Sequence, residues 1–313
     1  MGRLYLYKKQ ILPIFKRKMK DYEKLLEISK QDLEASKTLY SKKFYPHSAF
    51  FLQQSIEKAN KAFSIFINIA EDIKDAKKAN HNPLNLAKNA AEKYEKENQY
   101  FEEELKDKPH LQDLFEDSKP HFENLKSGAK DMIETVNLMN KSKDKIFRVK
   151  EENIEKGIDT IYKNLDYLEQ QEKELKEREP PKGFNIFLKS LFEEQVKSLG
   201  EKLSKKEYPP LDLEKVEGAK KEALKEIESG DFLRDHIKRQ LFINKATQVF
   251  AGLNFLTGLT LAFESSSRYP EELNNWKLPS ELYNEDLAII KKINLLFELQ
   301  GKLLKKFDDL ISL

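Results

Sequence analysis

The chain has 313 residues, of which 10 are glycine, 11 are proline and none is cysteine, and 35% are charged. Without cysteine it has no disulfide, no thiolate nucleophile and no cysteine-ligated zinc site. The formal net charge of +2 predicts no strong general attraction to nucleic acid. Few helix breakers, abundant Lys and Glu, and 11% aromatic residues predict long helices with solvated outer faces, and therefore an all-α protein.

The first twenty residues are basic, with seven Lys and Arg interleaved with Tyr and Phe. Two interpretations are open, a phosphate-contacting arm or a partly packed lead-in helix. This start has no uninterrupted apolar stretch of signal-peptide length. The longest apolar run, 249–263, contains polar residues and is too short to span a bilayer. We therefore expect a cytoplasmic protein with no membrane-spanning segment.

Apolar residues at helical spacing predict two consecutive helices, over about 21–43 and 46–70, the first capped by Asp21. Pro46 separates them, because proline disfavours helix at the residue before it and suits a first helical turn. Helices joined by so short a break are expected to pack antiparallel. After a second break, a short helix is predicted over about 84–96.

The segment 96–240 is richer in Glu and Lys and is interrupted by prolines, among them Pro120, at which a helix break is predicted. Apolar residues still recur in it at helical spacing: Ile154, Ile158, Ile161, Leu165 and Leu168. A spacing near seven is compatible with a short antiparallel coiled-coil hairpin. We expect an inserted helical subdomain here, followed by a final helical pair over about 241–264 and 284–310.

Four stretches, in the same order, resemble the HEPN domain family (higher eukaryotes and prokaryotes nucleotide-binding). DLEASKTLYSKKFY (32–45) matches the family's first helix, and YPHSAFFLQQSIEKANKAF (45–63) looks like its signature second helix. HNPLNLA (81–87) resembles the family's His-Asp-Leu segment, from which Asn-Pro-Leu departs. SSSRYPEEL (265–273) is similar to the Arg-Tyr-Pro loop of the long-loop branch.

The resemblance implies a fold and its boundaries. We expect an up-and-down antiparallel bundle of four or five helices, formed jointly by residues 1–95 and 241–313. The inserted helical subdomain, 96–240, lies between these two pieces in the sequence. HEPN bundles commonly dimerise, so the resemblance also implies a homodimer.

The resemblance further implies a role in nucleotide or RNA binding. Catalytic HEPN ribonucleases carry an Arg followed by a His with four to six residues between them, for acid–base chemistry and for offsetting phosphate charge. None of the seven arginines here has a His at that spacing, and the nearest pair, Arg234 and His236, has one residue between. We therefore expect a non-catalytic protein that binds nucleotide or RNA, or that is the partner of a small nucleotidyltransferase.

Two alternatives stay open. The protein could be an interaction or scaffold protein that works through its helical insertion. It could also be a ribonuclease of a toxin–antitoxin or defence system with a relocated histidine, in which His81 or His47 approaches Arg268 or Arg239 in the fold. The sequence has no phosphate-cradling Gly-rich loop and no metal-ligand spacing, so we expect neither a metal ion nor another cofactor.

The predicted site centres on one face of the second helix, where residues recur at i, i+3, i+4 and i+7: Gln54, Glu57, Lys58 and Lys61. One interpretation is a polar strip in a cleft, with Lys61 placed for phosphate and Gln54 for a base or ribose. The other is a solvent-facing Glu57–Lys61 pair worth roughly a few tenths of a kcal/mol.

The resemblance adds three residues to this candidate ligand site: His81, Arg268 and Tyr269. His81 matches the family's histidine, and its alternative role is to cap or pack near a helix N-terminus. Arg268 contacts phosphate, or it braces the bundle through helix-terminal carbonyls. For Tyr269 we expect packing rather than stacking.

Overall fold

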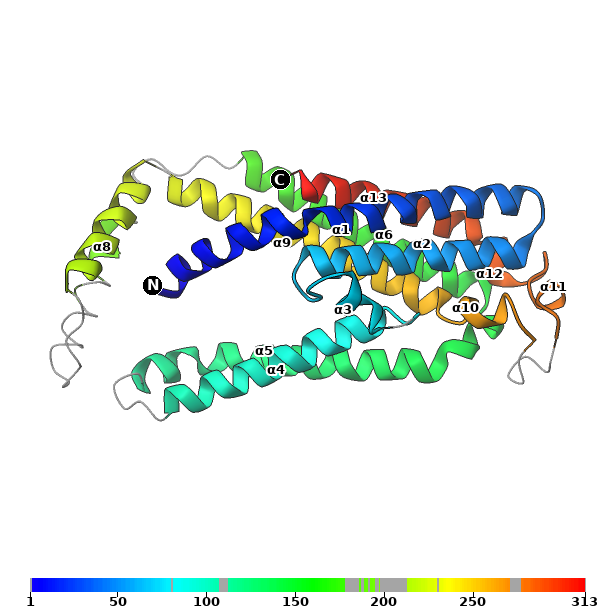
Figure 1. Cartoon of the computed structure of the whole chain (residues 1–313), viewed down its shortest axis with the longest axis horizontal. Helices are drawn as coiled ribbons and strands as arrows, with labels where there is room; N and C mark the ends of the chain where they lie inside the picture. The colour runs from blue at the N-terminus through cyan, green and yellow to red at the C-terminus, as the bar shows by residue number, and fades with distance from the viewer. Residues whose placement is uncertain are drawn as a thin grey trace. The chain divides into compact units, whose positions relative to one another are not determined.

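Helices make up the regular structure of this protein (Figure 1). The computed structural model describes the following residues: 2–79, 81–106, 112–177, 186, 189–190, 192–194, 197, 213–229, 231–270 and 277–312. These residues contain no β-strand, so the all-α prediction is confirmed. Within the same ranges, no helix combines the length and the apolar character needed to cross a membrane.

The chain divides into two compact units. The first unit comprises Met1–Lys96, Leu125–Asp166 and Lys245–Ser312, and the second comprises Glu97–Asn124 and Tyr167–Asn244. The first unit thus contains most of the two pieces expected to form the bundle. It also takes in residues from the segment expected to be an insertion.

The first two helices form an antiparallel hairpin, α1 (Gly2–Ser41) and α2 (Tyr45–Phe66) (Figure 1). Pro46 occupies the first turn of α2, as predicted. The expected helix start at Asp21 is wrong, because a capping residue begins a helix only where the preceding residues are not helical. The side chains of residues 1–20, including the basic ones, lie outside the described part of the chain.

Serine pairs hold α1 and α2 together. Ser29 Oγ donates to the backbone carbonyl of Ser55 at 2.7 Å. Farther along, Ser36 Oγ donates to the carbonyl of Ser48 at 2.6 Å, and Ser48 Oγ donates back to that of Ser36 at 2.9 Å. A step of seven residues along α1 meets a step of seven back along α2, as antiparallel helices require. Because serine is small, the two helices can approach closely, and the buried hydroxyls of Ser29, Ser36 and Ser48 are each satisfied by a carbonyl of the facing helix.

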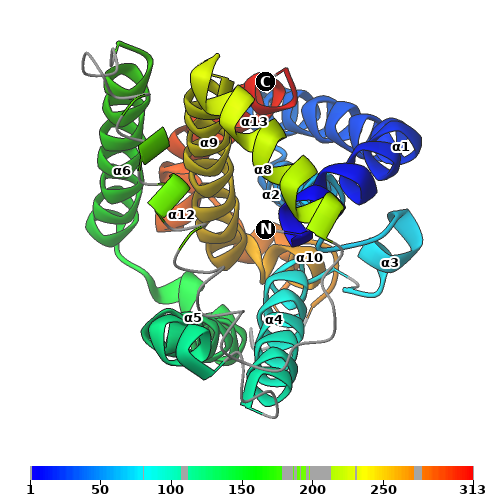
Figure 2. The same ribbon diagram turned by 90° about the vertical axis from the view of Figure 1, so that its left-hand side faces the viewer.

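The C-terminal helix α13 (Ile293–Ile311) packs on this hairpin, and Figure 2 shows it beside α1. The part of α9 (Asp231–Thr260) from Lys245 onward belongs to the same unit. Phe307 of α13 is fully buried, and its ring centroid lies 5.4 Å from that of Phe63 and 5.5 Å from that of Phe66. On α9, Thr257 Oγ1 accepts a hydrogen bond from Asn60 Nδ2 at 3.0 Å. Segments about 200 to 240 residues apart in sequence therefore share one interior.

Residues 125–166 belong to the same unit. They comprise the last part of α5 (Gln112–Ser142), the 3₁₀ helix η2 (Lys143–Arg148) and the first part of α6 (Glu151–Glu177). Three predicted stripe residues of α6 are buried: Ile154, Ile158 and Leu165. The expected break at Pro120 is wrong, because α5 runs through it. A proline removes one backbone donor and bends a helix without always ending it.

The other helices are shorter or connect these elements: α3 (Ile73–Lys77), α4 (Leu84–Lys106), α8 (Leu213–Glu228), α10 (Phe263–Ser266), α11 (Pro279–Leu282) and α12 (Ala288–Lys291). A small cluster joins the start of α4 to α5 and to the turn after α9, through Leu84, Val136 and Leu261. Two of these segments matter most for the site. The turn before α4 brings His81 beside α2, and α10 brings Glu264, from the C-terminal part of the chain, beside His81.

Candidate functional site

One face of α2 carries the polar residues predicted for it, and two of them are buried. The side chains of Glu57 and Lys61 are only 6% and 10% exposed, and Lys61 Nζ lies 2.6 Å from Glu57 Oε1. The interpretation of this pair as solvent-facing is therefore wrong. The reason is tertiary: His81, from the turn before α4, lies against Glu57, and that contact is invisible in the periodicity of α2.

Glu57 is the centre of a polar network. Its Oε2 accepts a hydrogen bond from Gln53 Nε2 at 3.1 Å and lies 3.2 Å from His81 Nδ1. Burial by itself raises the pKa of the Glu57 carboxyl, but the hydrogen bond and charge of Lys61, together with Gln53 and His81, outweigh it and hold that pKa below its usual value. Glu57 is therefore a carboxylate at neutral pH.

The network reaches the C-terminal segment through His81. His81 Nε2 lies 3.9 Å from Glu264 Oε1, and the same Glu264 oxygen contacts Arg268 Nη2. Arg268 Nε also donates to the Glu264 backbone carbonyl at 2.9 Å, which is a bracing contact of the kind expected for this arginine. The fold thus places His81 and Arg268 beside the same carboxylate oxygen.

The other end of the network lies between α1 and α2. Lys58 Nζ is 2.5 Å from Asp32 Oδ2 of α1 and donates to Gln54 Oε1 at 3.1 Å. Gln54 Nε2 in turn donates to Gln53 Oε1 at 2.7 Å. A continuous chain of polar contacts therefore runs from Asp32 to Arg268. We call it the α2 network: Asp32, Gln53, Gln54, Glu57, Lys58, Lys61, His81, Glu264 and Arg268.

Two aromatic rings hold the Arg268 guanidinium. Its central carbon lies 5.1 Å from the centroid of the Phe50 ring and 5.2 Å from that of Tyr269, which is within the range of a cation–π contact. Tyr269 was expected to pack in the bundle, but its side chain is 59% exposed. That expectation is wrong, because the tyrosine lies exposed in the loop after α10, with Arg268 over its ring.

The structure brings together all the predicted site residues, with Tyr269 joined through its contact to Arg268. Sequence reasoning missed three members of the network, Asp32, Gln53 and Glu264. Glu264 could have been found, because it precedes Arg268 by four residues on a helical stretch, the spacing of an intrahelical ion pair. Asp32 and Gln53 gave no such signal, since their contacts depend on how α1 and the turn before α4 pack on α2.

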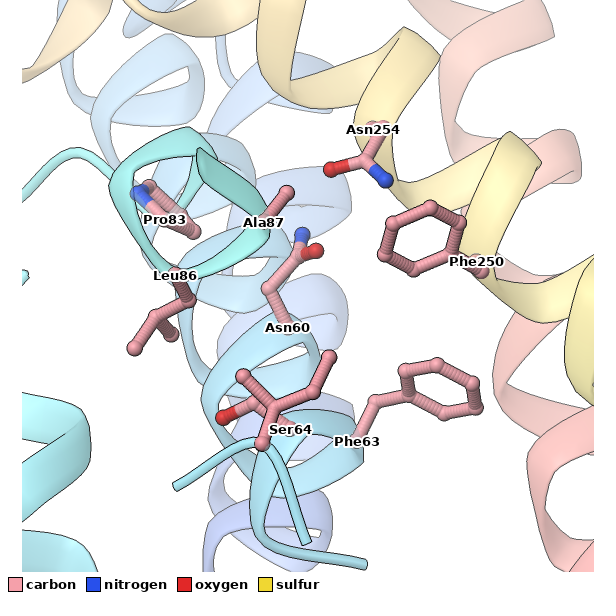
Figure 3. Close-up of a pocket in the computed structure, with 9 residues that line it drawn as sticks. Asn60, Phe63, Ser64, Pro83, Leu86, Ala87, Phe250 and Asn254 are labelled. Atoms are coloured by element: carbon pink, nitrogen blue, oxygen red, sulfur yellow. The ribbon is translucent and has the colours of Figure 1, made fainter. Parts of the chain in front are cut away.

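A small pocket opens beside α2, lined by Asn60, Phe63 and Ser64 from α2 and by residues of the α4 start and α9 (Figure 3). It has about 10 Å³ for the centre of a water molecule, room for roughly one water. Asn60 Nδ2 is already hydrogen-bonded to Thr257 and to the Ile56 carbonyl. A nucleotide does not fit this pocket.

The charges of the α2 network balance when His81 is neutral. Lys58 pairs with Asp32, Lys61 with Glu57, and Arg268 with Glu264. The guanidinium of Arg268 has five N–H donors, of which two make the contacts described above. The His81 side chain is 59% exposed. Arg268 and His81 are therefore exposed to solvent, whereas Lys61 is enclosed.

The architecture and this network define an all-helical protein with a charged, His- and Arg-containing edge. A family profile described as HEPN domain matches residues 22–145. The chain therefore contains a HEPN domain, and the family that its sequence resembles is confirmed. Searches of curated proteins and of solved structures gave no significant match.

The matched region covers α2 and His81 but ends before Glu264 and Arg268. It also includes residues 96–145, which were expected to belong to the insertion. The expected boundaries of the bundle and of the insertion therefore stay a prediction.

Proposed function

We propose that the exposed edge of the α2 network binds phosphate groups of a nucleotide or of RNA, so that this HEPN protein is a non-catalytic binding protein or the partner of a small nucleotidyltransferase. One observation supports this most strongly. Side chains from α2, from the turn before α4 and from α10 and its following loop converge on Glu57 and Glu264. A buried carboxyl whose pKa is shifted by specific partners, as that of Glu57 is, marks a candidate functional site.

The network divides into a supporting part and a contacting part. Lys61 is paired with Glu57 and Lys58 with Asp32, so these two lysines support the network and do not contact the ligand. Glu264 and the rings of Phe50 and Tyr269 fix the orientation of the Arg268 side chain, which still has N–H donors left for a phosphate. A guanidinium is well suited to phosphate, because it can donate two parallel hydrogen bonds to the phosphate oxygens. His81 donates to the same anion from the other side when it is protonated.

Isothermal titration calorimetry of the full chain with ATP, GTP and a short single-stranded RNA tests this proposal. Arg268→Ala and His81→Ala are expected to weaken binding by about tenfold each, the loss of one charge-assisted hydrogen bond. Arg148→Ala is the matched control, since Arg148 is an exposed arginine of η2 in the same unit, and it should bind as the wild type does. No heat with any of the three ligands, and no co-purifying transferase, rejects the proposal.

A second candidate function, a metal-independent ribonuclease, is favoured by the position of His81. In the tautomer whose Nδ1–H donates to Glu57, His81 Nε2 is the nitrogen that can accept a proton. It could take the proton of a ribose 2′-hydroxyl, whose oxygen then attacks the adjacent phosphorus. The 5′-oxygen leaves with a proton, a 2′,3′-cyclic phosphate forms, and Arg268 offsets the added negative charge.

Incubation of total RNA with EDTA present separates the two functions. The ribonuclease should leave 2′,3′-cyclic ends, and both His81→Ala and Glu57→Gln should lower the cleavage rate by at least about a hundredfold. RNA that stays intact with the wild type ends this second candidate and leaves the binding function in place. Size-exclusion chromatography with light scattering tests the proposed homodimer in the same preparation.

A further inference from the structure

The N-terminal end of α2 carries exposed aromatic side chains that no apolar interior accounts for. Phe44, the residue before the helix, is 53% exposed, and Tyr269 is 59% exposed. His47 is exposed as well, and Phe50 is half-buried. We call these four residues the aromatic edge. Exposed aromatic groups bordered by charged ones commonly mark a binding surface.

The aromatic edge is continuous. The Phe44 and His47 rings meet edge to face, with centroids 6.3 Å apart. Phe50 follows His47 by three residues, so the two lie on the same face of α2. Arg268 then lies over the Phe50 ring and over the Tyr269 ring, which joins Phe50 to Tyr269 through the guanidinium.

The aromatic edge runs directly into the α2 network. Phe50, Gln54 and Glu57 follow one another at i, i+4 and i+7 along the same face of α2. Arg268 belongs to both sets, because it contacts Phe50 as well as Glu264. From Phe44 to Glu57 the helix rises about 20 Å, which corresponds to roughly six stacked nucleotides at about 3.4 Å each. A mononucleotide would occupy only a fraction of this surface.

We propose that the aromatic edge is a base-stacking subsite and that the ligand is therefore a single-stranded oligonucleotide. This inference rests on the proposed function, in which a phosphate binds at His81 and Arg268. Bases adjoining that phosphate stack on Tyr269 and Phe44, while Arg268 contacts the backbone between them. Stacking on aromatic rings tolerates every base, so this surface selects single strands by length rather than by sequence.

Fluorescence anisotropy with the full-length protein and labelled oligoadenylates of one, two, four and eight nucleotides tests the inference. Affinity is expected to rise with each added nucleotide up to about six. Phe44→Ala and Tyr269→Ala should each weaken binding of the eight-nucleotide strand by about tenfold or more. Binding of ATP should not change in Phe44→Ala, because Phe44 lies outside the α2 network, whereas Tyr269 holds Arg268 and its loss can also affect the phosphate site. Tyr269→Phe should bind as the wild type does, because it keeps the ring and loses only the hydroxyl.

Tyr167→Ala is the matched control, since Tyr167 is an equally exposed aromatic residue (61%) on α6 and belongs to the other unit. All variants keep the basic N-terminal residues, so any contribution of these residues to RNA binding cancels in the comparison. Arg268→Ala should also lower the slope of log affinity against log salt concentration by about one, as the loss of one phosphate contact predicts.

Four results would overturn the inference. Equal affinity for ATP and the eight-nucleotide strand, or full binding by the Phe44→Ala/Tyr269→Ala double variant, excludes stacking while the proposed phosphate site survives. A change of oligomeric state in the unliganded double variant would instead make the aromatic edge a contact between copies. If no nucleotide or oligonucleotide binds at all, the proposed function has failed and this inference with it.

Discussion

Replacing the buried Glu57–Lys61 pair tests whether the α2 network is an electrostatic unit. Lys61→Met leaves the Glu57 carboxylate buried with Gln53, Gln54 and His81 as its partners. Removing one partner of a buried pair costs about 3–5 kcal/mol, and the three remaining partners favour the lower end, about 3 kcal/mol. Glu57→Gln keeps the shape of the side chain but removes the negative charge that strengthens its hydrogen bonds to Lys61 and His81, which should lower the stability by about 2 kcal/mol.

The double variant, Glu57→Gln with Lys61→Met, should lose less than these two costs together. Neither charge is left buried alone, so we expect about 3 kcal/mol in total and a coupling of about 2 kcal/mol between the two positions. The exposed Glu34–Lys37 pair of α1 is the control. The same substitutions there should change the stability by no more than about 0.5 kcal/mol.

Hydrogen exchange of the α2 amides, measured by mass spectrometry, is the suitable assay. The chain has two compact units, so a global denaturation curve need not report the first unit alone, whereas amide exchange reports the opening of α2 itself. Strictly additive effects at Glu57 and Lys61 would show that the two side chains do not form a buried pair in solution. If the substitutions at Glu57 and Lys61 changed the stability as little as those at Glu34 and Lys37, the Glu57–Lys61 pair would not be buried in solution.

Three further predictions concern the same unit. A Cβ at Gly252 would lie within 3 Å of the buried Leu303 of α13, so Gly252→Ala should lower the melting temperature. The nearest neighbour of a Cβ at Gly301 lies at 4.0 Å, so Gly301→Ala should leave the melting temperature unchanged or raise it. The pKa of Glu57 is lower in the folded state, so ionised Glu57 stabilises the fold fully above the ordinary value of 4.5, and this stabilisation is lost as the pH falls through the lowered value. Glu57→Gln should therefore flatten the acid limb of a curve of stability against pH. An unchanged limb would contradict this. Tyr283→Phe removes the buried hydroxyl that lies 2.6 Å from Ser266 Oγ and should cost about 1 kcal/mol in urea denaturation, where no change would show that the hydroxyl is not bonded.

The sequence predicted the helical class, the α1–α2 hairpin and the site face of α2. These follow from local rules: the 3.6-residue period, the position of Pro46 and the shared face of Gln54, Glu57, Lys58 and Lys61. Local rules also explain where the prediction went wrong. Residues 2–20 have the composition of a helix, so a good capping residue at position 21 was not sufficient to start one there.

The sequence could not predict the burial of Glu57, because periodicity gives the face of a helix but not what covers it. His81 covers that face only because the turn before α4 folds back on α2, and Glu264 joins only because α10 does so from about 200 residues farther along the chain. The same holds for Tyr269. A tyrosine before proline gives no sign of its exposure, which depends on the loop after α10.

The extent of the bundle was also difficult to predict. Residues 125–166 look like the rest of the Glu- and Lys-rich segment, yet Ile154, Ile158 and Leu165 are buried in the first unit. Their stripe was visible in the sequence, but the element against which it packs was not. The surface ion pairs that Glu151 makes with Lys291 and Lys292 are likewise contacts between distant segments.

The central claim is that His81 and Arg268 bind one phosphate together, although they come from distant parts of the chain. A double-mutant cycle of ATP binding with His81→Ala, Arg268→Ala and the double variant tests it most directly. Two groups on one ligand phosphate should show a coupling free energy of at least about 1 kcal/mol. Independent effects, with the double variant losing the sum of the two single losses, would contradict a shared site on the α2 network.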